Sequence, residues 1–173
     1  PTPDDNQAEA PDAFFDEIAN VNQSAVKRQT IGNCWIYATL GWAESLHKAR
    51  TNQEVNLSES YVTFWDWFEK ITSGSGVSER TETQGNRTVT TRTIQTGGSW
   101  QLAVGIIKRR GLMREADFIP EEATSESSAR QSAAQTAINA ALADGGELAT
   151  REARRDGAVV LRVLTRAWGL NPT

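Results

Sequence analysis

The stretch 29–50, QTIGNCWIYATLGWAESLHKAR, contains the only cysteine of the chain, Cys34. A Gly-Asn pair that favours a turn precedes this cysteine, and the residues after it form one long helical run. A thiol at the start of a helix meets unpaired backbone N–H groups and the positive end of the helix dipole, which favour the thiolate. Because the thiolate is the form that attacks, Cys34 is the candidate nucleophile of this chain.

The first half of this predicted helix, from Trp35 to Ala43, carries apolar side chains on every face. A helix that is apolar all round is expected in the middle of a domain. Its last turns are polar and include His47 and Arg50, which suit the negative end of a helix. We therefore expect Cys34 at the point where a buried helix reaches the surface. A lone cysteine is more often a small buried hydrophobe, so the interpretation depends on the residues that flank it.

Three motifs follow one another along the chain. The first is Gln29 with Gly32-Asn33-Cys34-Trp35. The second is Asn56-Leu57-Ser58-Glu59-Ser60-Tyr61, followed by Phe64-Trp65-Asp66. The third is Gly97-Gly98-Ser99-Trp100, followed by Lys108-Arg109-Arg110-Gly111-Leu112. Together they resemble the nucleophile-bearing part of papain-like cysteine peptidases, in the branch of bleomycin hydrolase and aminopeptidase C.

The resemblance implies a role for each residue of these motifs. Cys34 would be the nucleophile and Gln29 a donor to the oxyanion. Gly97 and Gly98 would pair with the main chain of an extended peptide substrate, and Trp35 and Asn33 would complete the substrate-binding residues. Two departures stand out. The upstream glutamine lies five residues before the cysteine instead of six, and no second cysteine precedes the nucleophile.

A cysteine peptidase also needs a general base, usually a histidine that an Asn or Asp orients. The one histidine, His47, lies 13 positions after Cys34, which corresponds to roughly 20 Å along one helix. In papain-like enzymes the base lies about 130–150 residues after the nucleophile, and residues 48–173 contain no histidine. We therefore expect a second polypeptide or a continuation to carry the catalytic His and Asn, preferably through maturation of one precursor into two associated chains.

The expected fold is mostly α, the left (helical) half of a papain-like α+β fold. Residues 1–12 are an acidic, proline-rich leader, and residues 13–173 are the nucleophile-bearing half-domain, beginning with a short helix at 13–19. A helix over 58–71, capped by Ser58, places an aromatic stripe in the core, with Tyr61, Phe64, Trp65, Phe68 and Ile71.

The segment 73–96 is polar and is predicted to be a β-hairpin, around Gly85-Asn86, or a mobile loop inserted beside the substrate groove. Ser99 is expected to cap a helix over 100–110 that stops at Gly111. Two further helices are expected at about 125–143 and 147–167. The first is alanine-rich and therefore peripheral, and the arginines of the second form a solvated face.

Composition excludes several classes of function. A chain of 173 residues with 38% hydrophobic residues and six tryptophans can bury a core. The net charge of −4 argues against a nucleic-acid partner, and no apolar run reaches the roughly 20 residues that span a bilayer. One Cys and one His do not make a usual zinc site, so we expect no metal and no cofactor. A chain without an internal disulfide suits the cytoplasm or a bacterial exported protein, with a slight preference for the latter.

Two other functions compete with that of a peptidase. A papain-like pseudoenzyme, acting as a binding or regulatory module, would keep the nucleophile half without the base. A transglutaminase-like enzyme would use a helix-capped cysteine for a different acyl transfer. Labelling of Cys34 by an epoxide-type peptidase inhibitor distinguishes the first from a peptidase, and amine transfer to glutamine would support the second.

Overall fold

The computed structural model describes residues 25–125 and 127–171. The predicted leader at 1–12 and the short helix at 13–19 lie outside the described residues. The elements, in chain order, are α1 (Cys34–Thr51), α2 (Glu59–Ser73), β1 (Val77–Gln84), β2 (Arg87–Ile94), α3 (Trp100–Arg110), α4 (Glu115–Phe118), a 3-10 turn (Pro120–Glu122), α5 (Ala129–Leu142), α6 (Arg151–Arg155) and α7 (Gly157–Ala167). The described part is therefore mostly α, with one two-stranded sheet. None of its helices is long and apolar enough to cross a membrane.

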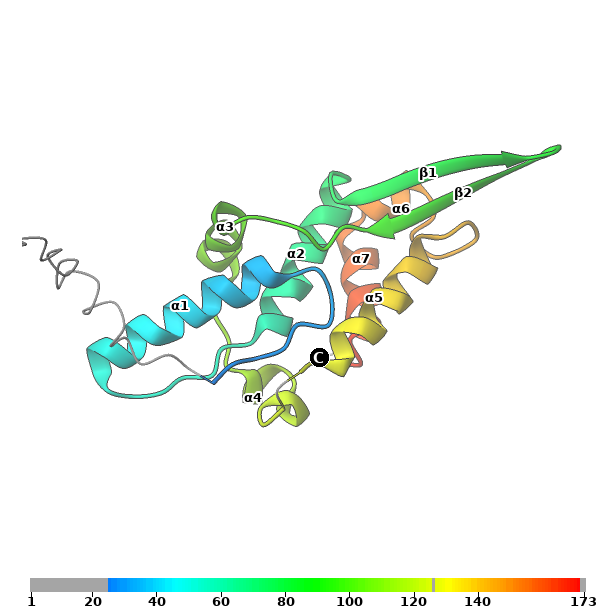
Figure 1. Cartoon of the computed structure of the whole chain (residues 1–173). Coiled ribbons are helices and arrows are strands. Elements are labelled where there is room, and N and C mark those ends of the chain that lie inside the picture. Colours follow the sequence, from blue (N-terminus) through cyan, green and yellow to red (C-terminus); the bar gives the residue numbers. More distant parts are fainter. Residues whose placement is uncertain (1–24, 126, 172–173) are drawn as a thin grey trace, which may run out of the picture.

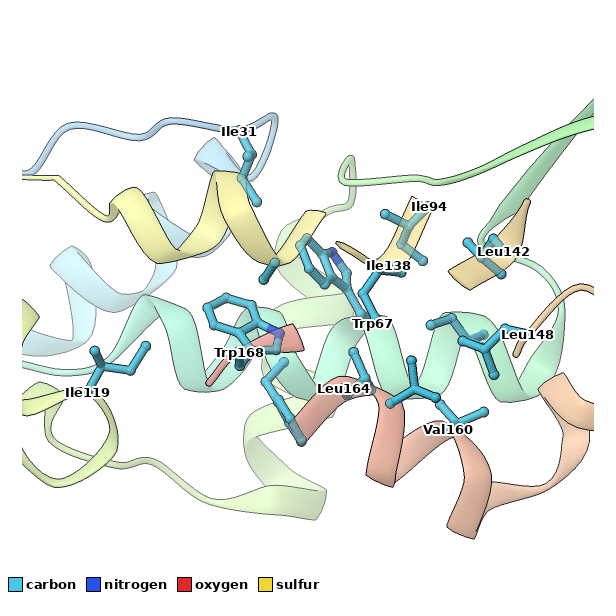
Figure 2. Close-up of a cluster of buried hydrophobic side chains, with 14 residues drawn as sticks. Ile31, Trp67, Ile94, Ile119, Ile138, Leu142, Leu148, Val160, Leu164 and Trp168 are labelled. Atoms are coloured by element: carbon cyan, nitrogen blue, oxygen red, sulfur yellow. The ribbon is translucent and has the colours of Figure 1, made fainter. Parts of the chain in front are cut away.

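Helix α2 lies in the middle of the molecule, with α1 and α3 on one side and α5 and α7 on the other (Figure 1). Each side has its own hydrophobic cluster. In the larger cluster Trp67 of α2 packs against Trp168, with 5.4 Å between the ring centroids. Ile138 of α5 and Leu164 of α7 close around this pair (Figure 2). Helix α2 thus joins two cores into one unit.

The central position of α2 corrects the predicted aromatic stripe. Phe64 and Ile71 are buried as expected, but Tyr61, Trp65 and Phe68 are only half-buried. The fully buried Trp67 was not in the stripe. Because α2 packs on two sides, its buried arc is wider than the single stripe that a surface helix presents.

The burial of two other helices, α1 and α5, also differs from the prediction. Trp42 of α1 is 55% exposed and packs edge to face on Trp100 of α3, so α1 is not buried on every side as the sequence predicted. The prediction that the alanine-rich helix is peripheral was also wrong, since Ala134, Ile138 and Leu142 of α5 are fully buried. The buried residues of α5 recur every three or four positions and so form one face, which includes its two large apolar side chains, Ile138 and Leu142.

The C-terminal helices are shorter than predicted. The expected helix at 147–167 is split into α6 and α7 by Asp156, whose side chain accepts hydrogen bonds from the amides of Ala158 and Val159 and so caps α7. The four-residue helix α4 was not predicted. The arginine side chains of α7, Arg162 and Arg166, are exposed and pair with Glu147, in agreement with a solvated face.

The strands β1 and β2 form an antiparallel hairpin, in register from Val77 opposite Ile94 to Gln84 opposite Arg87. The ribbon extends away from the helices (Figure 1). Its base is fastened to α5, because the amide of Ile94 donates to Asn139 Oδ1 at 2.9 Å. The strand pairing agrees with the hairpin alternative. That the hairpin is an insertion beside a substrate groove stays a prediction.

Candidate functional site

Cys34 is the first residue of α1, and its side chain is exposed. The preceding residue, Asn33, is the N-cap position, where an asparagine usually accepts hydrogen bonds from the first helical amides. Here the Asn33 side chain turns inward instead. Its Nδ2 donates to Thr63 Oγ1 and to Gln131 Oε1, both at 3.0 Å, and the residue is 1% exposed. The turn before Cys34 is thus tied to α2 and α5.

The inward turn of Asn33 leaves the start of α1 without a side-chain cap, whereas serines cap α2, α3 and α5. Within the described residues no group accepts a hydrogen bond from the backbone amides of Cys34 and Trp35. Uncapped amides at a helix start attract negative charge. The exposed thiol therefore lies next to donors that are available to an oxyanion.

The segment 95–98 runs beside the start of α1. Trp35 Nε1 donates to the carbonyl of Thr96 at 2.9 Å. A Cβ on Gly32 would lie 2.6 Å from Thr96 Oγ1, and a Cβ on Gly98 would lie 2.4 Å from the Trp35 indole. Only glycine at positions 32 and 98 allows this approach without displacing those side chains.

Gly97 and Gly98 are exposed, and nothing lies within 4 Å of a Cβ on Gly97. Within residues 25–125 and 127–171, no intramolecular hydrogen bond involves the N–H or C=O of Gly98. An open glycine backbone of this kind can pair with the main chain of an extended peptide. The side chains of Trp35 and Asn33 are buried. That these two residues take part in substrate binding stays a prediction.

Gln29 lies in the extended segment before the turn, and its side chain is exposed. The segment is fastened at three points. Lys27 Nζ donates to both carboxylate oxygens of Glu59 at 2.9 Å. The backbone of Arg28 pairs with that of Ser127 in an isolated parallel β-bridge. Thr30 Oγ1 donates to the carbonyl of Ser128 at 2.8 Å. The backbone on both sides of Gln29 is therefore held in place.

Comparison with known proteins accords with this geometry. Residues 4–159 match the Peptidase C1-like family. The chain belongs to this family.

Within the peptidase C1-like family, the chain falls in the branch of aminopeptidase C and bleomycin hydrolase. It is 30% identical to aminopeptidase C of Lactobacillus helveticus over 144 residues, which are 79% of this chain and 31% of that protein. It is 26% identical to bleomycin hydrolase of Oryctolagus cuniculus over 125 residues, 68% of this chain and 45% of that protein. The match thus spans less than half the length of these relatives. No solved structure matches the chain significantly.

A member of the peptidase C1-like family would pair its thiol with a histidine, and the described residues bring none to Cys34. His47 is exposed and lies in the last turns of the same helix, α1. At 1.5 Å per residue, the 13 positions between them correspond to roughly 20 Å. Residues 25–125 and 127–171 contain no group of three or more His, Cys, Asp or Glu side chains placed to hold a metal ion.

Sequence reasoning did not identify a buried acidic cluster that includes Glu44, Glu59 and Glu115. Glu44 and Glu59 share the Lys27 ammonium, and Glu115 accepts a hydrogen bond from Ser58 Oγ at 3.0 Å. Burial raises the pKa of Glu59, and it raises the pKa of Glu115 to about 7. The signal that could have found it is a glutamate inside the second motif, directly after the serine that caps α2.

Proposed function

We propose that this chain supplies the nucleophile and the oxyanion hole of a papain-like cysteine peptidase. The observation that carries the proposal is the exposed Cys34 thiol at an uncapped helix start, beside the open backbone of Gly98, in a chain of the peptidase C1-like family. Two relatives, named aminopeptidase C and bleomycin hydrolase, support peptide-bond hydrolysis as the reaction.

In the proposed reaction, a histidine takes the proton of the Cys34 thiol, and the thiolate attacks the carbonyl carbon of a peptide. The Cys34 amide and the Gln29 side chain donate to the oxyanion that forms. The carbon–nitrogen bond then breaks as the histidine returns the proton to the leaving amine. Water hydrolyses the thioester and restores the thiol.

The histidine and its orienting asparagine come, in this proposal, from a continuation of the chain or from a second polypeptide. The position of His47 on the same helix as Cys34 supports this, because a rigid helix keeps the two side chains apart. The substrate is a peptide or protein whose main chain lies along Gly97 and Gly98.

The test is labelling of Cys34 by a peptidyl epoxide in the assembled protein, read by mass spectrometry of the modified peptide. Labelling at Cys34, with turnover abolished in Cys34→Ala, is the expected result. Gln29→Ala should leave weak turnover, reduced by about 10²–10³. An epoxide that leaves Cys34 unmodified, with turnover unaffected by Cys34→Ala, would indicate a binding module instead.

A further inference from the structure

Lys70, in the last turn of α2, is a buried cation: the residue is 9% exposed, and its partner Asp66 is 1% exposed. The two lie one helical turn apart, with 2.7 Å between Lys70 Nζ and Asp66 Oδ2. Burying a charge is expensive unless it is paired and hydrogen-bonded. A buried ion pair of this kind is therefore weak evidence for a stabilising role, and its remaining contacts indicate what it does.

The Lys70 ammonium has three N–H donors, and the structure supplies three acceptors. Besides Asp66, it donates to the carbonyl of Gln95 at 2.9 Å and to the carbonyl of Gly97 at 2.7 Å. Its Nζ also lies 5.4 Å from the centroid of the Trp35 ring. Two of its three hydrogen bonds are thus made to the backbone of the segment 95–98, which runs beside the start of α1.

The loop after α2 packs closely against the side chain of Lys70. A Cβ on Gly76 would lie 2.2 Å from Lys70 Cβ, so only a glycine can pass there. The carbonyl of Gly76 accepts from the amide of Gln95 at 2.8 Å, which brings the segment 95–98 against the same loop. The aliphatic part of Lys70 is therefore enclosed, and each of the three N–H donors of its ammonium has an acceptor.

We propose that Lys70 is a positioning residue for the peptide substrate. Lys70 holds the carbonyls of Gln95 and Gly97, and Trp35 holds that of Thr96. With three successive carbonyls held from α1 and α2, the N–H and C=O of Gly98 stay open at a fixed distance from Cys34. This inference rests on the proposed function, because it assigns the peptide to the Gly98 backbone.

The test compares two reagents on Cys34 in the full chain with its His-bearing segment. A peptidyl epoxide must use the Gly98 backbone, whereas iodoacetamide reads only the reactivity of the thiol. In Lys70→Met, the rate of labelling by the epoxide should fall by about tenfold, the equivalent of one lost hydrogen bond of about 1.4 kcal/mol. The rate with iodoacetamide should stay within about twofold, a difference of roughly 0.4 kcal/mol.

Two further variants distinguish a loss of substrate positioning from a general loss of stability. Lys70→Met leaves Asp66 buried and unpaired, so the double variant Asp66→Asn/Lys70→Met removes both charges and should give the same selective loss. Lys48→Met, which removes a partner of the exposed Glu54, is the matched control and should change neither rate. Equal rates for the wild type and the double variant with the epoxide would overturn the proposal, as would a parallel fall with both reagents.

Hydrogen exchange separates this proposal from the proposed function. The amide of Gln95, which donates to the carbonyl of Gly76, should exchange faster in the double variant, while those inside α3 should not. If the wild type shows no preference for the epoxide over iodoacetamide, the peptidase function fails. Faster exchange at Gln95 would then still establish that Lys70 fixes this segment, and unchanged exchange would overturn that as well.

Discussion

At the scale of single residues, the protein keeps several carboxyl groups where water cannot solvate their charge. Asp66 and Glu115 are 1% and 5% exposed. Burial raises the pKa of Asp66 to about 6, even though Lys70 opposes the shift, and the pKa of Glu115 to about 7. The charges of Glu59 and Glu122 push the pKa of Glu115 in the same direction. Both groups therefore bind a proton more tightly in the folded chain than in the unfolded one.

This shift predicts that the chain loses stability as the pH rises. The contribution of Glu115 is complete below its ordinary pKa of 4.5 and is lost as the pH passes through about 7. For Asp66 the corresponding window runs from 3.8 to about 6. The free energy of unfolding, measured by urea titration at a series of pH values, should fall between these limits. Glu115→Gln should flatten the decline at its upper end.

The exposed Glu152 provides the control for this measurement. Glu152→Gln should leave the pH dependence of unfolding unchanged. A Glu115→Gln variant whose free energy of unfolding falls with pH as steeply as that of the wild type, between 4.5 and about 7, would contradict the assignment to Glu115.

At the scale of elements, the helix starts were predictable because short polar side chains cap them. Ser58 and Ser99 accept from the amides of Tyr61 and Leu102, as the sequence indicated. The start of α1 at Cys34 followed from the turn before it. The division of the predicted helix at Asp156 was missed because the basic residues of α6 are followed almost directly by the apolar residues of α7, which suggested one continuous helix. Asp156 itself is a good N-cap residue.

The surroundings of the candidate site were less predictable than its position. The sequence indicated that Cys34 and the Gly97-Gly98 pair belong together, through resemblance alone. It gave no sign that Trp35 and Lys70 reach the carbonyls of residues 95–97, because those contacts join segments 25 to 61 residues apart. Lys70 was not considered, since a lysine near a helix end is usually solvated.

The contact between α1 and the segment 95–98 leads to a prediction with a built-in control. Gly98→Ala places a methyl group against the Trp35 indole and should lower the free energy of unfolding by about 1–3 kcal/mol. Gly97→Ala points into open space and should change it by less than about 0.5 kcal/mol. Thermal unfolding followed by circular dichroism checks both. Equal stability of the two variants would mean that the segment is not packed on Trp35.

At the scale of the whole molecule, the helices enclose two cores while other apolar groups stay at the surface. Trp42 and Trp100 are 55% and 44% exposed, yet they pack on each other with 5.0 Å between ring centroids. Trp42 lies two helical turns after Cys34 on α1. The exposed face of α1 therefore runs from Cys34 to this aromatic pair. That a second segment faces Cys34 stays a prediction.

Apart from Val77 and Ile94 at its base, the hairpin lies outside both cores, and this predicts that the body folds without most of it. From Ser78 to Thr93 the strands bury no apolar side chain, and the base is held by Ile94 and by the pairing of Arg92 with Glu79 and Asp144. Replacing residues 80–91 by an Asn-Gly turn keeps those contacts. The free energy of unfolding should therefore change by less than about 1 kcal/mol, and iodoacetamide should label Cys34 at an unchanged rate. Removing Ile94 from its site by Ile94→Ala is the matched comparison and should cost about 2–5 kcal/mol. A shortened hairpin that unfolds as readily as Ile94→Ala would show that the ribbon supports the core.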